Sequence, residues 1–168
     1  EGPFVSPDRR GALPASWITA PDAGLFRRLL ESCDPFLRLI TVAPEIPGAL
    51  DLIEDAVAAG VRVSLGHTDA GYDSALPGFR AGASHVTHAF NAMRFHHRDP
   101  GLLGALLSHG KCTAELITDG VHVAPEVALW LNASFLGRIY GVSDGCAAMG
   151  SKKGQALTLG SLKLEKRG

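Results

Sequence analysis

The stretch VRVSLGHTDAGYDSALPGFRAGASHVTHAF, residues 61–90, carries the pattern that decides the fold. It starts with a short apolar, β-prone run, continues through a helix-like segment and returns to a second β-prone run. A strand, a helix and a strand at this spacing indicate a parallel βα unit. Each β-prone run leads directly into an imidazole, His67 after the first and His88 after the second, so the ends of these two strands are the first place to look for function.

The same alternation extends over most of the chain. Further strand-like runs cover residues 37–42, 113–118 and 138–143, and helix-like segments cover residues 48–60, 72–83, 100–110 and 124–137. The fold class is therefore α/β, with about five parallel strands. A complete (β/α)₈ barrel has eight strands and usually about 250 residues. Two architectures remain open at this point: a complete five-stranded doubly wound domain, or the later half of a TIM-type barrel.

Composition narrows the class of protein. The chain has 168 residues, 46% of them hydrophobic and 20% charged, which is typical of one soluble globular domain. A net charge of −1 lacks the basic patch expected of a nucleic-acid or membrane-surface binder. We see no signal peptide and no apolar run near the roughly 18–20 residues that cross a bilayer. Three scattered cysteines predict reduced thiols and a cytoplasmic location. The first residue is Glu rather than Met, which predicts a processed chain or a piece of a longer one.

Polar side chains gather where the predicted strands end, which is where α/β folds bind ligands. In chain order these residues are Glu45, His67, Asp69, His88, Asn91, Asp119, His122 and Asp144. Each alone is compatible with a helix cap or a turn. Together, two imidazoles from adjacent strands and one carboxylate can hold a divalent ion that keeps a position open for water. A further carboxylate, Asp144, can then transfer a proton, and this set is what amide hydrolysis requires.

Other histidines and other chemistries fit less well. His85 lies three residues before His88, and in a strand this offset predicts that the two side chains face opposite sides. We expect the neighbouring His96 and His97 to lie on a loop surface. The sequence contains no GxSxG elbow, no recognisable cysteine nucleophile motif and no glycine-rich phosphate loop.

Seven motifs, in this order, closely resemble the N-acetylglucosamine-6-phosphate deacetylases of the amidohydrolase superfamily. They are EGPFVSPDRRGA, VAPE, LGHTDA, AGASHVTHAFNAM, HHRDPGLLGA, AELITDGVHV and YGVSDG. The resemblance implies a (β/α)₈ barrel with a small flanking β domain. On that basis we expect residues 1–150 to form a partial barrel, about strands four to eight, and residues 151–168 to begin the small β domain. It also implies removal of acetate from N-acetylglucosamine 6-phosphate, which leaves glucosamine 6-phosphate.

The same resemblance assigns roles at the metal site. Glu1, His67 and His88 match the family's metal ligands, and Asp144 matches its general base and acid. Two imidazoles and a carboxylate suit one Zn²⁺ ion, and Fe²⁺, Co²⁺ or Mn²⁺ are also accepted by such ligands. Ligands of a second metal would lie outside this chain.

For the substrate, the resemblance implies that the backbone amides of Asn91 and Ala92 help hold the phosphate and that His122 contacts the substrate. Arg98 matches an arginine that reaches the phosphate in the neighbouring subunit of a homodimer. Leu13 departs from the family pattern, which has His at this position. Leucine donates no hydrogen bond, and the loss of one such donor can raise a barrier by about 2.7–4 kcal/mol.

Two alternatives stay open: an amidohydrolase for a different amide, or a sugar-phosphate-binding relative without catalysis, which Leu13 favours. The joint presence of the metal ligands and Asp144 favours the deacetylase. A sheet that lacks its first strands leaves raw edges and apolar surface, so we also predict that the isolated chain folds poorly or aggregates.

Overall fold

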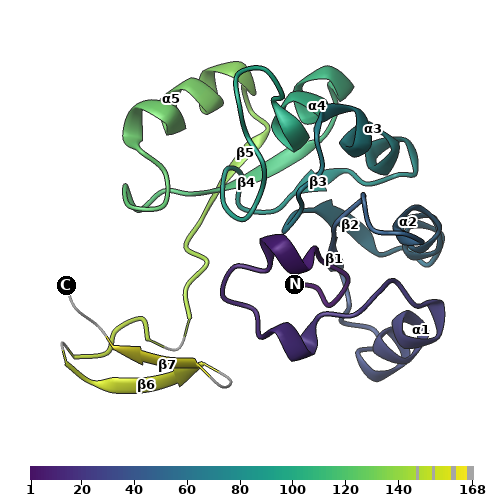
Figure 1. Cartoon of the computed structure of the whole chain (residues 1–168), viewed down its shortest axis with the longest axis horizontal. Coiled ribbons are helices and arrows are strands. Elements are labelled where there is room, and N and C mark those ends of the chain that lie inside the picture. The colour runs from purple at the N-terminus through teal and green to yellow at the C-terminus, as the bar shows by residue number, and fades with distance from the viewer. Residues whose placement is uncertain (147, 153, 160–161, 166–168) are drawn as a thin grey trace.

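The computed structural model describes residues 1–146, 148–152, 154–159 and 162–165. Five parallel strands form one sheet in the order β1-β2-β3-β4-β5, and helices alternate with them (Figure 1). The strands are β1 Leu39–Val42, β2 Arg62–Leu65, β3 His85–Val86, β4 Thr113–Ile117 and β5 Ile139–Val142. The helices are α1 Ala23–Ser32, α2 Ala49–Ala58, α3 Tyr72–Arg80, α4 Gly101–His109 and α5 Pro125–Ser134. The prediction of an α/β partial barrel is confirmed: β1 and β5 are the two ends of an open sheet.

The core lies between the sheet and its helices, which follow one another in an arc around the outer side of the strands (Figure 1). Alternate strand residues enter this core, for example Val63 and Leu65 of β2 and Val86 of β3, all fully buried. Residues between them face the inner side of the sheet, because successive side chains of a strand point to opposite faces. The site described below is built at the end of this inner side.

The inner face of the sheet is polar. The hydroxyls of Thr41, Ser64 and Thr87, from three neighbouring strands or strand ends, form a buried chain, with Oγ atoms of Ser64 and Thr87 2.6 Å apart and those of Thr41 and Thr87 3.0 Å apart. Gly66 completes this layer, because a Cβ atom there would lie 2.8 Å from Cβ of Thr87. Each buried hydroxyl therefore has a partner, as buried polar groups require.

His85 corrects one expectation. Its Nδ1 lies 2.6 Å from the Thr113 hydroxyl and its Nε2 lies 3.2 Å from a carboxylate oxygen of Glu115, on β4 residues that alternate with the core-facing Ala114 and Leu116. His85 thus faces the inner side, as His88 does, instead of the opposite side. The reason is local: His88 has φ 26°, outside extended geometry, so the alternation fails between the two residues.

The N-terminal segment is joined to the sheet by backbone hydrogen bonds. The N–H of Ala43 donates to the carbonyl of Phe4, and the N–H of Ser6 donates to the carbonyl of His67, both at 2.9 Å. Two 3₁₀ turns, Pro7–Arg9 and Ala15–Trp17, continue the segment, and α1 follows. These contacts place the first residues beside the carboxyl ends of β1 and β2.

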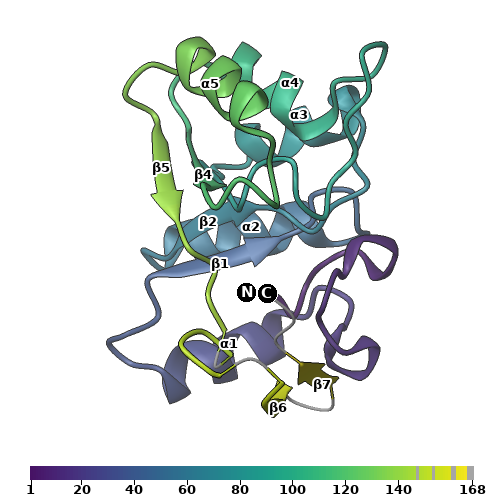
Figure 2. The ribbon, with the colours of Figure 1, turned by 90° about the vertical axis from the view of Figure 1, so that its left-hand side faces the viewer.

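The tail forms an antiparallel hairpin of β6 Ala156–Leu159 and β7 Leu162–Glu165. Figures 1 and 2 show it apart from the sheet, at the end of an extended segment that follows β5. A small β domain was expected to begin in this part of the chain, and residues 160 and 161, between the two strands, lie outside the described residues. The assignment of residues 151–168 to a separate domain stays a prediction. Among the described residues, no helix is long and apolar enough to cross a membrane.

Candidate metal centre

Three side chains from distant parts of the sequence converge at the end of the sheet. Oε1 of Glu1 lies 3.0 Å from Nε2 of His67 and 2.8 Å from Nε2 of His88, and the two Nε2 atoms are 3.0 Å apart. Both imidazoles are buried. Within the described part of the chain, this is the group of three whose ligand atoms lie close enough together to hold one metal ion.

Strand geometry brings the two histidines together. β2 and β3 are adjacent and parallel, and each imidazole follows the carboxyl end of its strand. Both residues adopt left-handed backbone conformations, with φ 47° at His67 and 26° at His88. Such conformations cost roughly 1–2 kcal/mol for a residue with a Cβ, and strain of this kind is concentrated at functional sites.

The hydrogen bond at the second ring nitrogen of His67 suits a metal ligand. Nδ1 of His67 lies 2.8 Å from the main-chain carbonyl oxygen of Arg9. A carbonyl only accepts, so Nδ1 donates to Arg9, and Nε2 is the ring nitrogen that faces Glu1 and His88. Nδ1 of His88 is buried without a hydrogen-bond partner among the described residues. The donor set of two nitrogens and one carboxylate oxygen fits a divalent ion.

Charge in the group also favours a cation. Hydrogen bonds from His67 and His88 hold the pKa of the Glu1 carboxyl far below its usual range, against the effect of burial. Burial lowers the pKa of His88, but the hydrogen bond to Glu1 and the negative charge of that carboxylate outweigh it, so the net shift is upward. An anionic carboxylate between two imidazoles draws positive charge, as protons or as a metal ion.

Asp144 lies apart from this group, on the exposed segment after β5, with φ 45°. The negative charge of Asp144 contributes to the upward shift of the His88 pKa, so Asp144 interacts electrostatically with the imidazole of His88. Asp144 also lines a cavity of about 890 Å³ together with His122. The cavity gives the carboxylate access to a ligand of sugar size.

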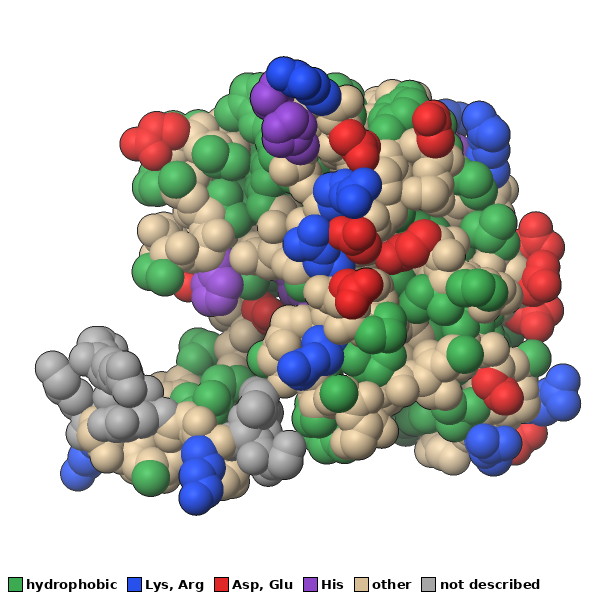
Figure 3. All heavy atoms as spheres, viewed as in Figure 1, with side chains coloured by type: hydrophobic (Ala, Val, Ile, Leu, Met, Phe, Trp, Pro, Cys, Tyr) green, Lys and Arg blue, Asp and Glu red, His purple; other side chains and the backbone are tan. Residues whose placement is uncertain are grey.

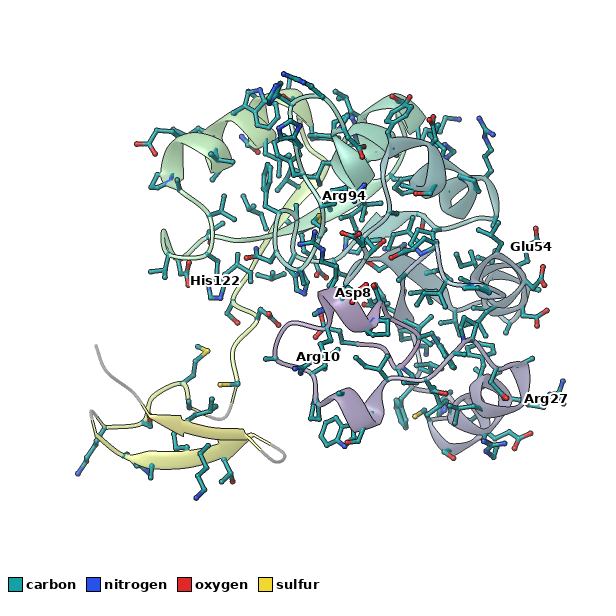
Figure 4. All side chains as sticks on the ribbon, viewed as in Figure 1. Asp8, Arg10, Arg27, Glu54, Arg94 and His122 are labelled. Atoms are coloured by element: carbon teal, nitrogen blue, oxygen red, sulfur yellow. The ribbon has the colours of Figure 1, made fainter. Side chains whose placement is uncertain are left out.

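His122 is held by Asp119 at the end of β4. Nδ1 of His122 lies 2.7 Å from Oδ2 of Asp119, and the backbone N–H groups of Val121 and His122 both donate to Oδ1 at 2.9 Å. These backbone hydrogen bonds, with the imidazole contact, lower the pKa of Asp119 to about 2. His122 faces the open space between the sheet and the hairpin (Figure 4).

The predicted phosphate-binding residues, Asn91 and Ala92, lie three and four positions after His88. The side-chain amide of Asn91 donates to the carbonyls of His88 at 3.4 Å and Ala89 at 3.3 Å, and the carbonyl of Ala92 accepts from the N–H of Thr68 at 3.1 Å. This places both residues between the loops that carry the two imidazoles. Arg98 is exposed and lines a different hollow. The structure therefore does not bring Arg98 to the metal ligands of its own chain.

Another of the predicted strand-end residues, Glu45, supports the loop after His67. The Glu45 carboxylate accepts hydrogen bonds from the Thr68 hydroxyl and, at 2.7 Å, from the N–H of Asp69. Leu13 lines an apolar pocket beside Glu1, Trp17 and Leu29. Its side chain has no polar atom that could replace the histidine of the family motif.

Sequence reasoning missed the role of Arg9, whose carbonyl orients His67, and the pair of His85 with Glu115. Neither has a local sequence signal, because the partners are 58 and 30 residues apart, respectively (115 − 85). The prediction of free cysteines is confirmed for Cys33, Cys112 and Cys146.

The chain is similar in sequence to proteins of known function. No protein-family model matches the chain. The N-acetylglucosamine-6-phosphate deacetylase of Bacillus subtilis (strain 168) is 42% identical over 158 residues, which cover 92% of this chain and 39% of that protein. The human N-acetylglucosamine-6-phosphate deacetylase is 36% identical over 173 residues, which cover 98% of this chain and 42% of that protein.

Solved structures of N-acetylglucosamine-6-phosphate deacetylases are also similar to this chain in fold. The D267A mutant of the Mycobacterium smegmatis enzyme, in complex with N-acetyl-D-glucosamine-6-phosphate, superposes with a TM-score of 0.93 at 38% identity and covers 98% of this chain and 43% of that one. The Thermotoga maritima enzyme gives a TM-score of 0.86 at 30% identity over 98% of this chain and 44% of that one. The chain spans about two fifths of the length of these curated relatives. By sequence and by fold, it belongs to the N-acetylglucosamine-6-phosphate deacetylase family.

Proposed function

We propose that this chain carries the metal centre and the proton-transfer carboxylate of an enzyme that hydrolyses the N-acetyl group of N-acetylglucosamine 6-phosphate, giving glucosamine 6-phosphate and acetate. The observation that carries the proposal is the convergence of Glu1 Oε1, His67 Nε2 and His88 Nε2 within 4.8 Å of one another. The relatives that cover this chain are deacetylases for that sugar phosphate by name.

Glu1, His67 and His88 would hold one divalent ion, for which Zn²⁺ is the best match to two nitrogens and one oxygen. An ion in such a site supplies Lewis acidity, which polarises a carbonyl and makes water acidic enough to attack at neutral pH. His67 arrives with its tautomer already set by the Arg9 carbonyl. The protein therefore orients this ligand before the ion binds.

Asp144 is the group that moves the proton. As the attacking water adds to the amide carbon, the Asp144 carboxylate takes its proton; when the C–N bond breaks, Asp144 returns the proton to the leaving amine nitrogen. Its exposure and its place in the cavity with His122 support this role, since a group that exchanges protons with substrate needs access to it. Asp119 holds the His122 ring through Nδ1 and leaves its Nε2 available for the sugar.

The phosphate end of the substrate would lie at Asn91 and Ala92. Both residues belong to the loop after His88, and Ala92 has φ 50°, a conformation in which consecutive backbone N–H groups can point to one side. Arg98 lies away from the metal group of its own chain, which is consistent with contact to the phosphate in a second subunit of a homodimer.

The test combines metal content with turnover. The chain as purified is analysed for bound metal and assayed for acetate release from N-acetylglucosamine 6-phosphate, alongside its His67→Ala variant. Near-stoichiometric metal that is lost in the variant supports the centre, and acetate release supports the reaction. Folded protein that binds no divalent ion would contradict the proposal. Equal acetate release from N-acetylglucosamine without phosphate would contradict the proposed substrate.

A further inference from the structure

The outer side of the His67 ring, away from the other two ligands, is covered by residues 9–11. The Arg9 carbonyl accepts from Nδ1 at 2.8 Å. Gly11 lies so close that a Cβ atom there would be 3.3 Å from Cε1 of the ring, and its φ of +56° favours glycine. The ring is therefore enclosed by backbone from a segment about 58 residues earlier in the chain.

The side chain of Arg9 returns to the loop that follows His67. Its Nε and one terminal nitrogen lie 2.8 and 2.7 Å from Oδ1 of Asp69. Asp69 is itself fixed, because its backbone N–H donates to Glu45 at 2.7 Å. Arg9 thus contacts the imidazole with its main chain and holds the residue two positions beyond that imidazole with its guanidinium. Arg9 therefore contacts both the imidazole of His67 and the loop that follows it.

The ion pair of Arg9 and Asp69 is part of a row of alternating charges. The other carboxylate oxygen of Asp69 lies 3.4 Å from Arg94, whose guanidinium also reaches Asp99 at 3.2 Å. Asp99 accepts from the backbone N–H groups of Tyr72 at 2.9 Å and Gly101 at 3.3 Å, at the starts of α3 and α4. Basic and acidic side chains alternate across this face of the molecule, with Arg94 near its centre (Figures 3 and 4).

We propose that Arg9 is a positioning residue for the metal centre, and that its ion pair with Asp69 holds the carbonyl that keeps His67 in its metal-binding orientation. The inference rests on the proposed metal centre. Partners that orient a ligating imidazole through its second nitrogen typically change metal affinity by about 10–100-fold when they are disturbed. Here a side-chain change acts indirectly, because it releases the main-chain acceptor.

The test measures the zinc dissociation constant of this chain by competition with a chromophoric chelator. Arg9→Ala and the isosteric Asp69→Asn should each weaken zinc binding by about tenfold or more. The double variant should bind zinc about as tightly as the single variant that binds less tightly, because each single change already breaks the Arg9–Asp69 ion pair. Arg10→Ala is the matched control. Arg10 is the neighbouring arginine, its guanidinium donates to the Leu13 carbonyl at 2.7 Å, and it lies in the same N-terminal loop (Figure 4).

A second readout separates positioning from general stability. In the zinc-loaded, ¹⁵N-labelled protein, the Nδ1–H proton of His67 should exchange slowly with water in the wild type and in Arg10→Ala, and faster in Asp69→Asn. Unchanged zinc affinity and unchanged Nδ1–H exchange in Asp69→Asn would overturn the inference and leave the metal centre intact. A wild-type chain that binds no zinc would overturn the metal centre, and the inference with it.

Discussion

The Nε2 atoms of His67 and His88 lie 3.0 Å apart at the ends of adjacent parallel strands, and the same carboxylate oxygen of Glu1 lies within 3.0 Å of both. Two ring nitrogens at this distance cannot both carry a proton toward each other. The arrangement is relieved when a cation takes the place of those protons, and this is the physical basis of the first prediction.

Replacing His67 with alanine should weaken divalent-metal binding by about 100-fold or more, because loss of a ligand should exceed the loss of an outer partner. Zinc affinity from chelator competition measures the change. His96→Ala, an exposed histidine on the loop before α4, is the control and should bind metal as the wild type does. Unchanged zinc affinity in His67→Ala would mean that the metal binds elsewhere.

Asp144→Asn should leave metal content unchanged and lower acetate release by about 10²–10⁴-fold, because the amide cannot accept the proton of the attacking water. Metal analysis and turnover are measured on the same sample. A variant that keeps its rate would remove Asp144 from the proton-transfer role.

Gly66→Ala should destabilise the protein by about 1–3 kcal/mol. The new methyl group would lie 2.8 Å from Cβ of Thr87, inside the buried layer of hydroxyls below the metal ligands. Gly141→Ala is the matched control, because a Cβ atom there meets its nearest neighbour at 3.7 Å in ordinary contact. Urea unfolding of the two variants gives the comparison, and equal midpoints would mean that the layer adapts to the extra atom.

Glu115 should make stability depend on pH in the acid range. The hydrogen bond from His85 lowers the carboxyl pKa below its ordinary 4.5, against the effect of burial. A depressed folded pKa stabilises the native state above pH about 4.5, and this contribution is lost as pH falls through the folded pKa.

Glu115→Gln should therefore cost on the order of 1 kcal/mol near pH 6, and the difference from wild type should shrink as pH falls below 4.5. Unfolding free energies at several pH values measure it. Glu54→Gln, on the exposed face of α2, is the control and should follow the wild-type profile (Figure 4). A difference that stays constant with pH would contradict the role of the Glu115 charge.

The sequence predicted the fold where periodicity carries the signal. All five strands coincide with short β-prone runs, and α2 to α5 lie within the four helix-like segments. α1 was not predicted, although Asp22 accepts from the N–H of Leu25 as a helix cap and apolar residues follow at helical spacing. The helix precedes the first predicted strand, so the strand–helix alternation that locates the other helices does not reach it.

The candidate site could be predicted in part. Strand ends and the family resemblance pointed to Glu1, His67 and His88, which the structure brings together. The orientation of His85 was predicted wrongly, because one left-handed residue, His88, breaks the two-residue period of a strand. The contact between the Arg9 carbonyl and His67 could not be predicted for another reason. Main-chain atoms have no sequence signature, and this contact depends on how a loop 58 residues away in the sequence folds.

A metal ion at the proposed centre would act as a cross-link as well as taking part in the reaction. Glu1 and His88 are 87 residues apart, and Glu1 belongs to a segment that backbone hydrogen bonds join to the strand ends. An ion held by all three side chains ties that segment to two strands at once, and it adds about 2.7 kcal/mol to native stability at a free concentration 100 times its dissociation constant. Chelation would then act as a structural switch: it lowers the melting temperature and opens the first residues to proteases before the rest of the sheet.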